Sequence, residues 1–435
     1  MARLERGART MKSLNIRRHL SGPPLTVQPP QLLPTRPGKG TAMDMTELSA
    51  DGPNAREAAL ALVEGAFARR GGLDDALDGA LGGLNVRDRA FARNLAMATL
   101  RRWGQIEQVL SDRLASPPPE IVTGLLRLGV AQILFTDVPD HAAVATILDM
   151  AQARPAARPF KGLLNAVLRG IVRNPPALRD ADLAPAWLLA RWKAAYGESE
   201  ALAIAAMIAQ EPATDLSLRD PKDMEALEPL LQGQRLPGGT LRAGLRGDLA
   251  QWPGFDEGRW WVQDAAAAIP ARLIAATADE TVLDLCAAPG GKTLQLATTG
   301  ARVTALDRSG GRLKRLAENL TRARLSAEIV ISPAETWLDG RTFDAVLLDA
   351  PCSATGTFRR QPEVLWLAKP GEIAKLAMVQ ARLLDAAARR VRAGGRLVYC
   401  VCSLEPEEGE AQASSSAPAT APSARSASAT AASVA

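Results

Sequence analysis

The sequence predicts a bundle of α-helices followed by an α/β domain built on a parallel sheet. Residues 54–174 repeat apolar side chains at helical spacing, with short Pro- or Gly-containing turns between the helices. From residue 281 onward, apolar runs alternate with amphipathic segments, which is typical of parallel strands whose two faces are covered by helices. At 435 residues, the chain is long enough for two or three domains.

Composition narrows the classes of function. No run approaches the about 20 apolar residues that span a bilayer, so we expect a soluble protein without a membrane partner. The four cysteines form no CxxC pair and there are only two histidines. We therefore expect neither a disulfide framework nor a metal site, and a location in a reducing cytoplasm. The net charge of +5 is compatible with a polyanionic partner but does not establish one.

The N-terminal part begins with a Pro-rich extension. Residues 1–52 are poor in acids and lack hydrophobic periodicity, so we expect them to be disordered. In residues 53–174, the segment NAREAALALVEGAFAR opens with a capping residue and repeats Leu60, Val63 and Phe67 on one helix face. Further segments continue in this style, so this range is predicted to be an all-helical domain.

Three segments follow the helical domain. Residues 175–275 mix helices with short strands and turns, and are predicted to form a linker and a small α+β subdomain. Residues 276–412 are predicted to form the parallel-sheet domain, with the strand runs TVLDLC, RVTALD, AEIVIS, FDAVLLDA and GRLVYCVCS. Residues 413–435 are low-complexity Ala, Ser, Pro and Thr, and are predicted to be disordered.

The turn after the first of these strands, in VLDLCAAPGGKT, is a candidate cofactor loop. Gly290 and Gly291 allow a ligand to approach the backbone, and the N-terminus of the following helix favours an anionic group. The next strand ends at Asp307, which is placed to bind the ribose hydroxyls of an adenosine cofactor. A P-loop would need glycine at Cys286 and a nicotinamide fingerprint would need GxGxxG, so S-adenosylmethionine remains. A purely structural turn is the alternative.

Two cysteines follow apolar, β-branched runs at the expected ends of parallel strands. Cys352 lies in LDAPCSATGTF and Cys402 lies in LVYCVCSLEPEEGE. Ligands bind beyond the carboxyl ends of such strands, so both cysteines are candidate site residues. Each could also serve only as a small buried hydrophobic residue, which is the commoner use of cysteine.

Three segments carry a family resemblance: DLCAAPGGKT, LLDAPCSATGTFRRQPEVLW and LVYCVCSLEPEEGE. In this order and spacing they closely resemble the RNA cytosine-C5 methyltransferases of the Sun/Fmu (Nol/Nop/Sun) family. The helical part, with LRLGVAQILFTDVPDHAAV and LLNAVLRGI, is similar to the NusB-type RNA-binding domain that precedes the catalytic domain in the bacterial enzyme acting on 16S ribosomal RNA. The resemblance runs from about residue 54 to residue 412.

This resemblance implies an activity and its partners. It implies a Rossmann-like methyltransferase domain, S-adenosylmethionine as cofactor, and RNA as substrate, with 16S ribosomal RNA expected. C5 of cytosine is a poor nucleophile, and a thiolate that adds to C6 activates it. Methylation of an exocyclic amine would need no thiol.

The resemblance also implies roles for individual residues. The family's attacking cysteine corresponds to Cys402, and Cys352 corresponds to the cysteine that assists product release. Asp349 corresponds to an acid near the methyl donor and the target base, where it would bond the N3 edge of cytosine. Arg359 and Arg360 are expected to meet RNA phosphates. The implied cofactor-binding residues are Cys286, Ala287, Ala288, Pro289, Gly290, Gly291, Lys292, Asp307 and Asp349.

Some features depart from the family pattern. Pro333, with Glu335 two residues later, stands where the family usually has an acid near the adenine. Cys400 stands where a small residue is typical, and we expect it to pack. The family chain also continues beyond EEGE through further strands, so we expect the last strand to be a sheet edge and the protein to be unstable or inactive. Two alternatives stay open: a catalytically impaired RNA-binding protein, and a cytosine-C5 methyltransferase that acts on tRNA.

Overall fold

The computed structural model describes residues 52–68 and 79–416. The expected disorder of the N-terminal extension, residues 1–52, therefore falls outside the described residues except for its last position. Within the described ranges, no helix is long and apolar enough to cross a membrane.

The described residues divide into two compact units. We call the first the helical unit; it contains the described residues up to 211 together with residues 357–367. The second, called the sheet unit, contains residues 212–356 and 368–416. The segment 175–275, predicted to form a linker and a small α+β subdomain, is divided between the two units at residue 211.

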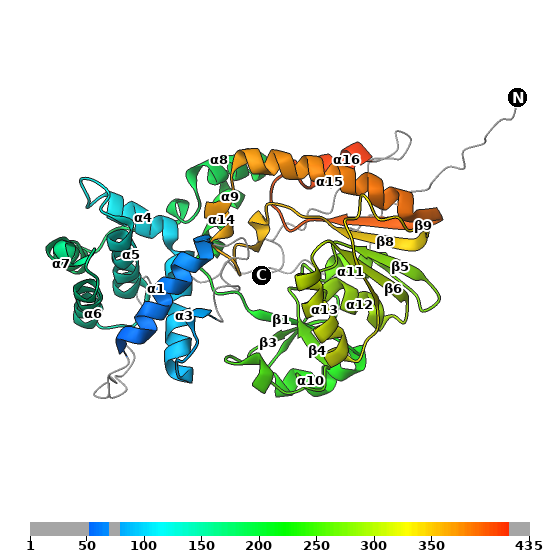
Figure 1. Cartoon of the computed structure of the whole chain (residues 1–435), viewed down its shortest axis with the longest axis horizontal. Coiled ribbons are helices and arrows are strands. Elements are labelled where there is room, and N and C mark those ends of the chain that lie inside the picture. The colour runs from blue at the N-terminus through cyan, green and yellow to red at the C-terminus, as the bar shows by residue number, and fades with distance from the viewer. Residues whose placement is uncertain (1–51, 69–78, 417–435) are drawn as a thin grey trace, which may run out of the picture. The chain divides into compact units, whose positions relative to one another are not determined.

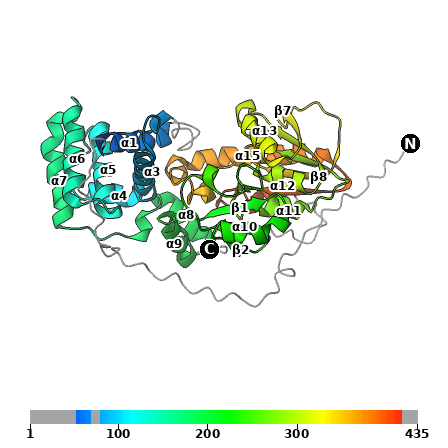
Figure 2. The ribbon, with the colours of Figure 1, turned by 90° about the horizontal axis from the view of Figure 1, so that it is seen from below.

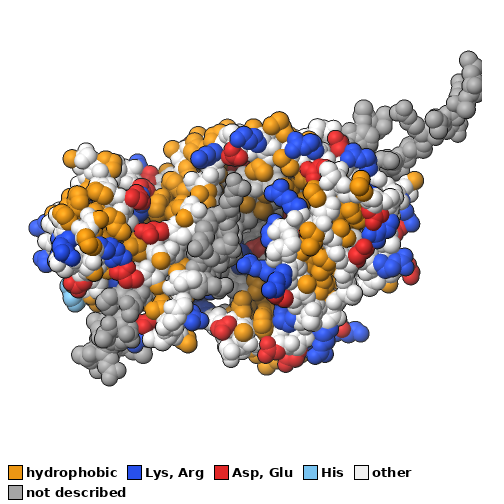
Figure 3. Space-filling view, viewed as in Figure 1, with side chains coloured by type: hydrophobic (Ala, Val, Ile, Leu, Met, Phe, Trp, Pro, Cys, Tyr) orange, Lys and Arg blue, Asp and Glu red, His pale blue; other side chains and the backbone are white. Residues whose placement is uncertain are grey.

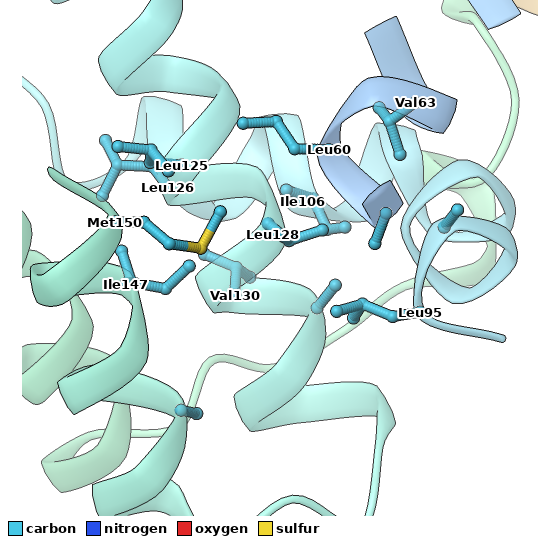
Figure 4. Close-up of a cluster of buried hydrophobic side chains, with 14 of the residues drawn as sticks. Leu60, Val63, Leu95, Ile106, Leu125, Leu126, Leu128, Val130, Ile147 and Met150 are labelled. Carbon is cyan, nitrogen blue, oxygen red and sulfur yellow. The ribbon is translucent and has the colours of Figure 1, made fainter. Parts of the chain in front are cut away.

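The helical unit opens with a bundle, as the sequence predicts. Its helices are α1 (Gly52–Ala68), α3 (Val86–Arg101), α4 (Trp103–Ser111), α5 (Glu120–Phe135), α6 (Asp140–Ala153) and α7 (Lys161–Arg173). Most of α5 is buried, because it packs against the other five helices. Side chains of α1, α3, α4, α5 and α6 meet in one apolar cluster (Figure 4). The buried Gln132 accepts a hydrogen bond from Arg56 Nε at 2.7 Å, so this polar group is satisfied inside the bundle.

The helical unit also contains a segment that is distant in sequence. Residues 357–367, called the inserted segment, include α14 (Val364–Leu367) and belong to this unit together with α8 (Ala186–Tyr196) and α9 (Glu198–Ile208). Phe358 is fully buried, and its ring lies 6.3 Å from that of Trp192. Arg101 Nη1 donates to the carbonyl oxygens of Gln210 and Arg359, both at 2.7 Å. The backbone of the inserted segment is therefore fixed by a side chain of α3.

The sheet unit begins with a small antiparallel sheet. Its elements are β1 (Thr214–Leu218), α10 (Met224–Leu230), β2 (Gln234–Leu236), β3 (Thr240–Ala243) and β4 (Trp260–Val262), and the strand order is β2-β3-β1-β4. The buried Asp215 of β1 accepts from Arg242 Nε at 2.8 Å and from the Ala265 amide at 3.2 Å. This carboxylate ties the small sheet to the chain that leads into the larger one.

The larger sheet has the predicted Rossmann-like architecture (Figures 1 and 2). Its elements are α11 (Ile269–Ile274), β5 (Thr281–Leu285), α12 (Gly291–Thr298), β6 (Arg302–Asp307), α13 (Gly310–Ala323), β7 (Glu328–Ile331), β8 (Phe343–Asp349), α15 (Pro370–Arg390) and β9 (Val391–Cys400). All neighbouring strands are parallel, in the order β7-β6-β5-β8-β9. Alternate strand residues point to opposite faces: Leu283 packs toward α15, whereas Val282 packs toward α11 and α12. The expectation of a sheet covered on both faces is confirmed.

The prediction for the last strand is confirmed, whereas the prediction for the residues that follow it is wrong in part. Within the described residues, β9 pairs only with β8 and is a sheet edge, as predicted. The predicted disorder from residue 413 is wrong for residues 413–416, because α16 (Glu410–Ser416) continues through them. Gln412 is buried and donates to the Ala377 carbonyl of α15 at 3.0 Å, which anchors this helix. The remainder of the low-complexity segment lies outside the described residues.

Candidate active site

The loop between β5 and α12 has the tight geometry that its glycines predict. Gly290 has φ +111°, and a Cβ at this position would lie 2.2 Å from Leu316 Cδ1 of α13. Cys286 also has a positive φ, of +60°. The amide of Ala287 donates to the Leu306 carbonyl at 3.1 Å, which fixes the start of the loop to the end of β6. The loop thus turns sharply at the carboxyl edge of the sheet, with Ala287 and Ala288 buried and Pro289 exposed.

Asp307 ends β6, as the sequence predicts, and faces this loop. Its carboxylate is almost fully buried and accepts hydrogen bonds from the Ala288 amide at 3.2 Å and the Ser309 amide at 2.9 Å. A carboxylate has about four acceptor positions, so two backbone bonds fix its orientation and leave capacity for further donors. Burial raises the pKa of the neighbouring Cys286 thiol to about 12, so this thiol stays protonated.

Three ionisable side chains, from β5, α12 and β8, lie near one another at the centre of the sheet. Lys292 Nζ donates to Asp349 Oδ2 at 2.7 Å. Asp284, on β5, is fully buried and accepts from Thr293 Oγ1 at 2.6 Å, while its Oδ1 atom has no hydrogen-bond partner in the described structure. Burial raises the pKa of Asp284 to about 7. Sequence reasoning missed Asp284, since an acid inside an apolar strand run gave no sign of its partners.

The two candidate cysteines are brought together at the ends of β8 and β9. Cys352 Sγ and Cys402 Sγ lie 3.4 Å apart, within hydrogen-bond distance for sulfur. Cys402 is exposed, whereas Cys352 is half-buried. The hydrogen bond from Cys352 lowers the pKa of the Cys402 thiol, against the opposing effect of burial. The same bond, together with burial, raises the pKa of the Cys352 thiol. The pair therefore favours a thiolate at Cys402 and a protonated thiol at Cys352.

Cys400 was expected only to pack, but it also makes a hydrogen bond to Asp349. It packs in the apolar cluster between β9, β8 and α11, as predicted. Its thiol also donates to Asp349 Oδ1 at 3.4 Å, and burial raises its pKa. Asp349 is therefore contacted from both sides, by Lys292 and by Cys400.

Comparisons with known proteins identify the family. Residues 271–429 match the family described as 16S rRNA methyltransferase RsmB/F, and residues 53–173 match the NusB family. Ribosomal RNA small subunit methyltransferase B of Sodalis glossinidius is 39% identical over 350 residues, which cover 75% of this chain and 80% of that protein. The protein of the same name from Vibrio cholerae is 34% identical over 360 residues, covering 77% and 82%.

The chain belongs to the 16S rRNA methyltransferase RsmB/F family. The crystal structure of the protein PH0851 has the same fold, with a TM-score of 0.70 and 24% identity over 84% of this chain and 89% of that one. As a member of this family, the chain is an S-adenosylmethionine-dependent RNA methyltransferase with an N-terminal NusB domain. The family resemblance found in the sequence is confirmed.

Proposed function

We propose that this RsmB/F-family chain methylates C5 of a cytosine in 16S ribosomal RNA, with Cys402 as the nucleophile. The observation that carries this proposal is the cysteine pair, in which the sulfur of the exposed Cys402 lies 3.4 Å from that of the less exposed Cys352. A thiol is needed for C5 chemistry but not for methylation of an exocyclic amine, so the pair favours the former. The names of the family and of its relatives support the small-subunit RNA as substrate.

The roles of the two thiols follow from their protonation. The Cys402 thiolate forms a bond to C6 of the cytosine, and C5 then carries the electron density that attacks the methyl group, whose bond to the sulfonium sulfur would break to leave a neutral thioether. A base removes the C5 proton, the C6–sulfur bond breaks, and the electron pair returns to Cys402. The Cys352 thiol donates a hydrogen bond to the departing thiolate, which stabilises the charge that appears on Cys402 as the product leaves.

The loop after β5 fits S-adenosylmethionine, which supplies an electrophilic methyl group when bound. The missing side chain at Gly290 makes room for Leu316 and so permits the sharp turn, and the amides at the start of α12 suit the carboxylate of the ligand. The buried, orientated carboxylate of Asp307 suits the ribose hydroxyls. We propose that residues 286–292 and Asp307 form this site.

Asp349 lies between the cofactor loop and the cysteine pair. Its carboxylate already accepts from Lys292 and Cys400, so it acts as an acceptor in this geometry. An acceptor suits the exocyclic amine of cytosine. A bond to N3 of neutral cytosine, as first expected, would instead need a protonated carboxyl. We therefore propose that Asp349 orients the target base through its amine.

The NusB-like bundle and the basic net charge support RNA binding. On the face shown in Figure 3, Lys and Arg side chains are scattered over both units and mixed with acidic ones. Such scattered cations can meet phosphates along an RNA without a single basic patch on that face. We propose a cytoplasmic location, where ribosomal RNA is modified.

Two single-cysteine variants test the proposal. The full chain is incubated with labelled S-adenosylmethionine and unmodified 16S RNA, with tRNA in a parallel reaction, and the labelled nucleoside is identified after digestion. Cys402→Ala should abolish methylation and form no covalent adduct. Cys352→Ala should retain adduct formation and accumulate a protein–RNA complex that survives denaturant, because release stalls.

Each outcome has a clear meaning. Label in 5-methylcytidine from 16S RNA supports the proposal, whereas label only from tRNA assigns the substrate to the alternative class. A Cys402→Ala variant that still methylates cytosine, or that alone forms the adduct, overturns the assignment of the nucleophile. Binding of S-adenosylmethionine without transfer to either RNA would favour an impaired RNA-binding protein.

A further inference from the structure

A buried carboxylate lies beneath the cysteine pair. Glu408 belongs to the acidic run EPEEGE, yet its side chain is fully buried, whereas the neighbouring Glu407 and Glu410 are exposed. An ionised carboxylate without partners is costly to bury, so its hydrogen bonds indicate what the position does.

The two oxygens of Glu408 collect donors from both cysteine loops. From the loop after β8, Ser353 donates twice: its amide to Oε1 at 2.9 Å and its hydroxyl to Oε2 at 2.5 Å. From the loop after β9, the Ser403 hydroxyl donates to Oε2 at 2.5 Å. Ser353 directly follows Cys352, and Ser403 directly follows Cys402. One carboxylate therefore joins the residues adjacent to both thiols.

Two further side chains fix Glu408, one at its carboxylate and one at its backbone carbonyl. Gln380 of α15 is fully buried, and its Nε2 donates to Glu408 Oε1 at 3.1 Å and to the Pro351 carbonyl at 3.0 Å. Tyr399 of β9 donates its hydroxyl to the Glu408 carbonyl at 2.5 Å. The network thus connects α15, β9 and both cysteine loops, and it leaves neither loop free to shift independently.

We propose that Glu408 is a positioning residue that holds the Cys352 thiol within hydrogen-bond distance of Cys402. This inference rests on the proposed function of the two cysteines. The adjacent backbone supports it: the Gly356 amide donates to the Cys402 carbonyl at 3.0 Å, so both loops run side by side where Glu408 joins them.

The negative charge of Glu408, like its hydrogen bonds, favours Cys352 as a hydrogen-bond donor to Cys402. The pKa of the Cys352 thiol is raised first by its hydrogen bond to Cys402, then by burial and by the charge of Cys402. The negative charge of Glu408 raises it further. Repulsion between Glu408 and a Cys352 thiolate keeps the proton on Cys352, where it is needed as a donor. Replacing the carboxylate by an amide removes this charge and turns one acceptor atom into a donor.

The test compares Glu408→Gln with Glu410→Gln, which makes the same chemical change at an exposed position two residues away. Glu408→Gln should lower kcat by about tenfold to a hundredfold, because a small displacement of a reacting group has an effect of this size. The affinity for S-adenosylmethionine, measured by calorimetry, should stay within about threefold of the parent value, whereas the KM for 16S RNA should fall together with kcat because release becomes the slow step. A denaturant-resistant protein–RNA adduct should accumulate, since Cys352 no longer supports release. Glu410→Gln should match the parent protein in all of these.

Further variants keep the result interpretable. If Glu408→Gln does not fold, Ser403→Ala removes one of the donors to Glu408, together with the contacts of that hydroxyl to Ser353 and the Glu405 amide, and should show the same adduct with a smaller fall in kcat. Adding Cys402→Ala should eliminate the adduct; if that double variant still methylates, the proposed function fails rather than this inference. A Glu408→Gln protein that melts earlier but has an unchanged kcat per folded molecule, with no adduct, would show that Glu408 only stabilises the fold and would overturn the inference.

Discussion

Replacing Gly290 by alanine should selectively destabilise the sheet unit, and Gly291→Ala is its matched control. At Gly290 the backbone has φ +111°, and the new Cβ would lie 2.2 Å from Leu316 Cδ1, a fully buried side chain of α13. The unfavourable backbone conformation costs about 1–2 kcal/mol for an L-residue. Displacing Leu316 in a packed core costs about 1–3 kcal/mol more. The free energy of unfolding should therefore fall by about 2–5 kcal/mol.

At the control position, Gly291, there is neither an unfavourable φ nor a close contact for a new Cβ. Gly291 is the first residue of α12, and a Cβ there would meet its nearest neighbour, Gln263, at 3.4 Å, an ordinary contact. Alanine there should be neutral or stabilising, because it favours the helix. The assay is differential scanning calorimetry of the full chain without cofactor, following the transition that shifts when S-adenosylmethionine is added. Equal midpoints for the two variants would refute the account of the loop.

Two further substitutions address other parts of the molecule. Burial raises the pKa of Asp284 to about 7 in the folded state. Protonation of Asp284 therefore makes its full contribution to the free energy of unfolding below the unfolded pKa of about 4, and this contribution is lost as the pH rises toward 7. Melting curves should show Asp284→Asn gaining stability relative to the parent between about pH 5 and pH 7.5, and a constant difference would contradict this assignment. In the helical unit, a Cβ at Gly104 would lie 2.0 Å from the Asp182 carbonyl oxygen and 2.8 Å from the Trp366 ring, so Gly104→Ala should lower the melting midpoint. Gly162→Ala, on α7 with open space around it, should not, and similar losses from both would count against the packing described.

The sequence predicted the features that depend on local pattern. The strand–turn–helix of the cofactor loop could be recognised because Gly290 and Asp307 stand at fixed distances from apolar strand runs. The approach of Cys352 and Cys402 could be anticipated in outline, because parallel strands bring their carboxyl ends to one edge. Their 3.4 Å separation could not, since it depends on side chains from several elements.

The features that sequence reasoning missed depend on tertiary packing. Glu408 is one acid among several in EPEEGE, and the run alone does not show that Glu405 and Glu408 are buried while Glu407 and Glu410 are exposed. Asp349 and Cys400 were read separately, although their contact links two strands. The helix through residues 413–416 was missed because the residues there are small and polar, and its anchor, Gln412, lies just before them.

The inserted segment means that the chain cannot be cut into independent modules at residue 211. A fragment that starts at Pro212 would carry the apolar Phe358 and Leu365 without the helices that bury them. Exposing a single such side chain costs about 1.5–3 kcal/mol, and it creates a site for aggregation. The same feature makes the protein suitable for splitting: two polypeptides separated at that point retain complementary surfaces, because the second fragment supplies a peptide that the first is shaped to bind. A methyltransferase assembled from two co-expressed halves would then report on that docking through its activity.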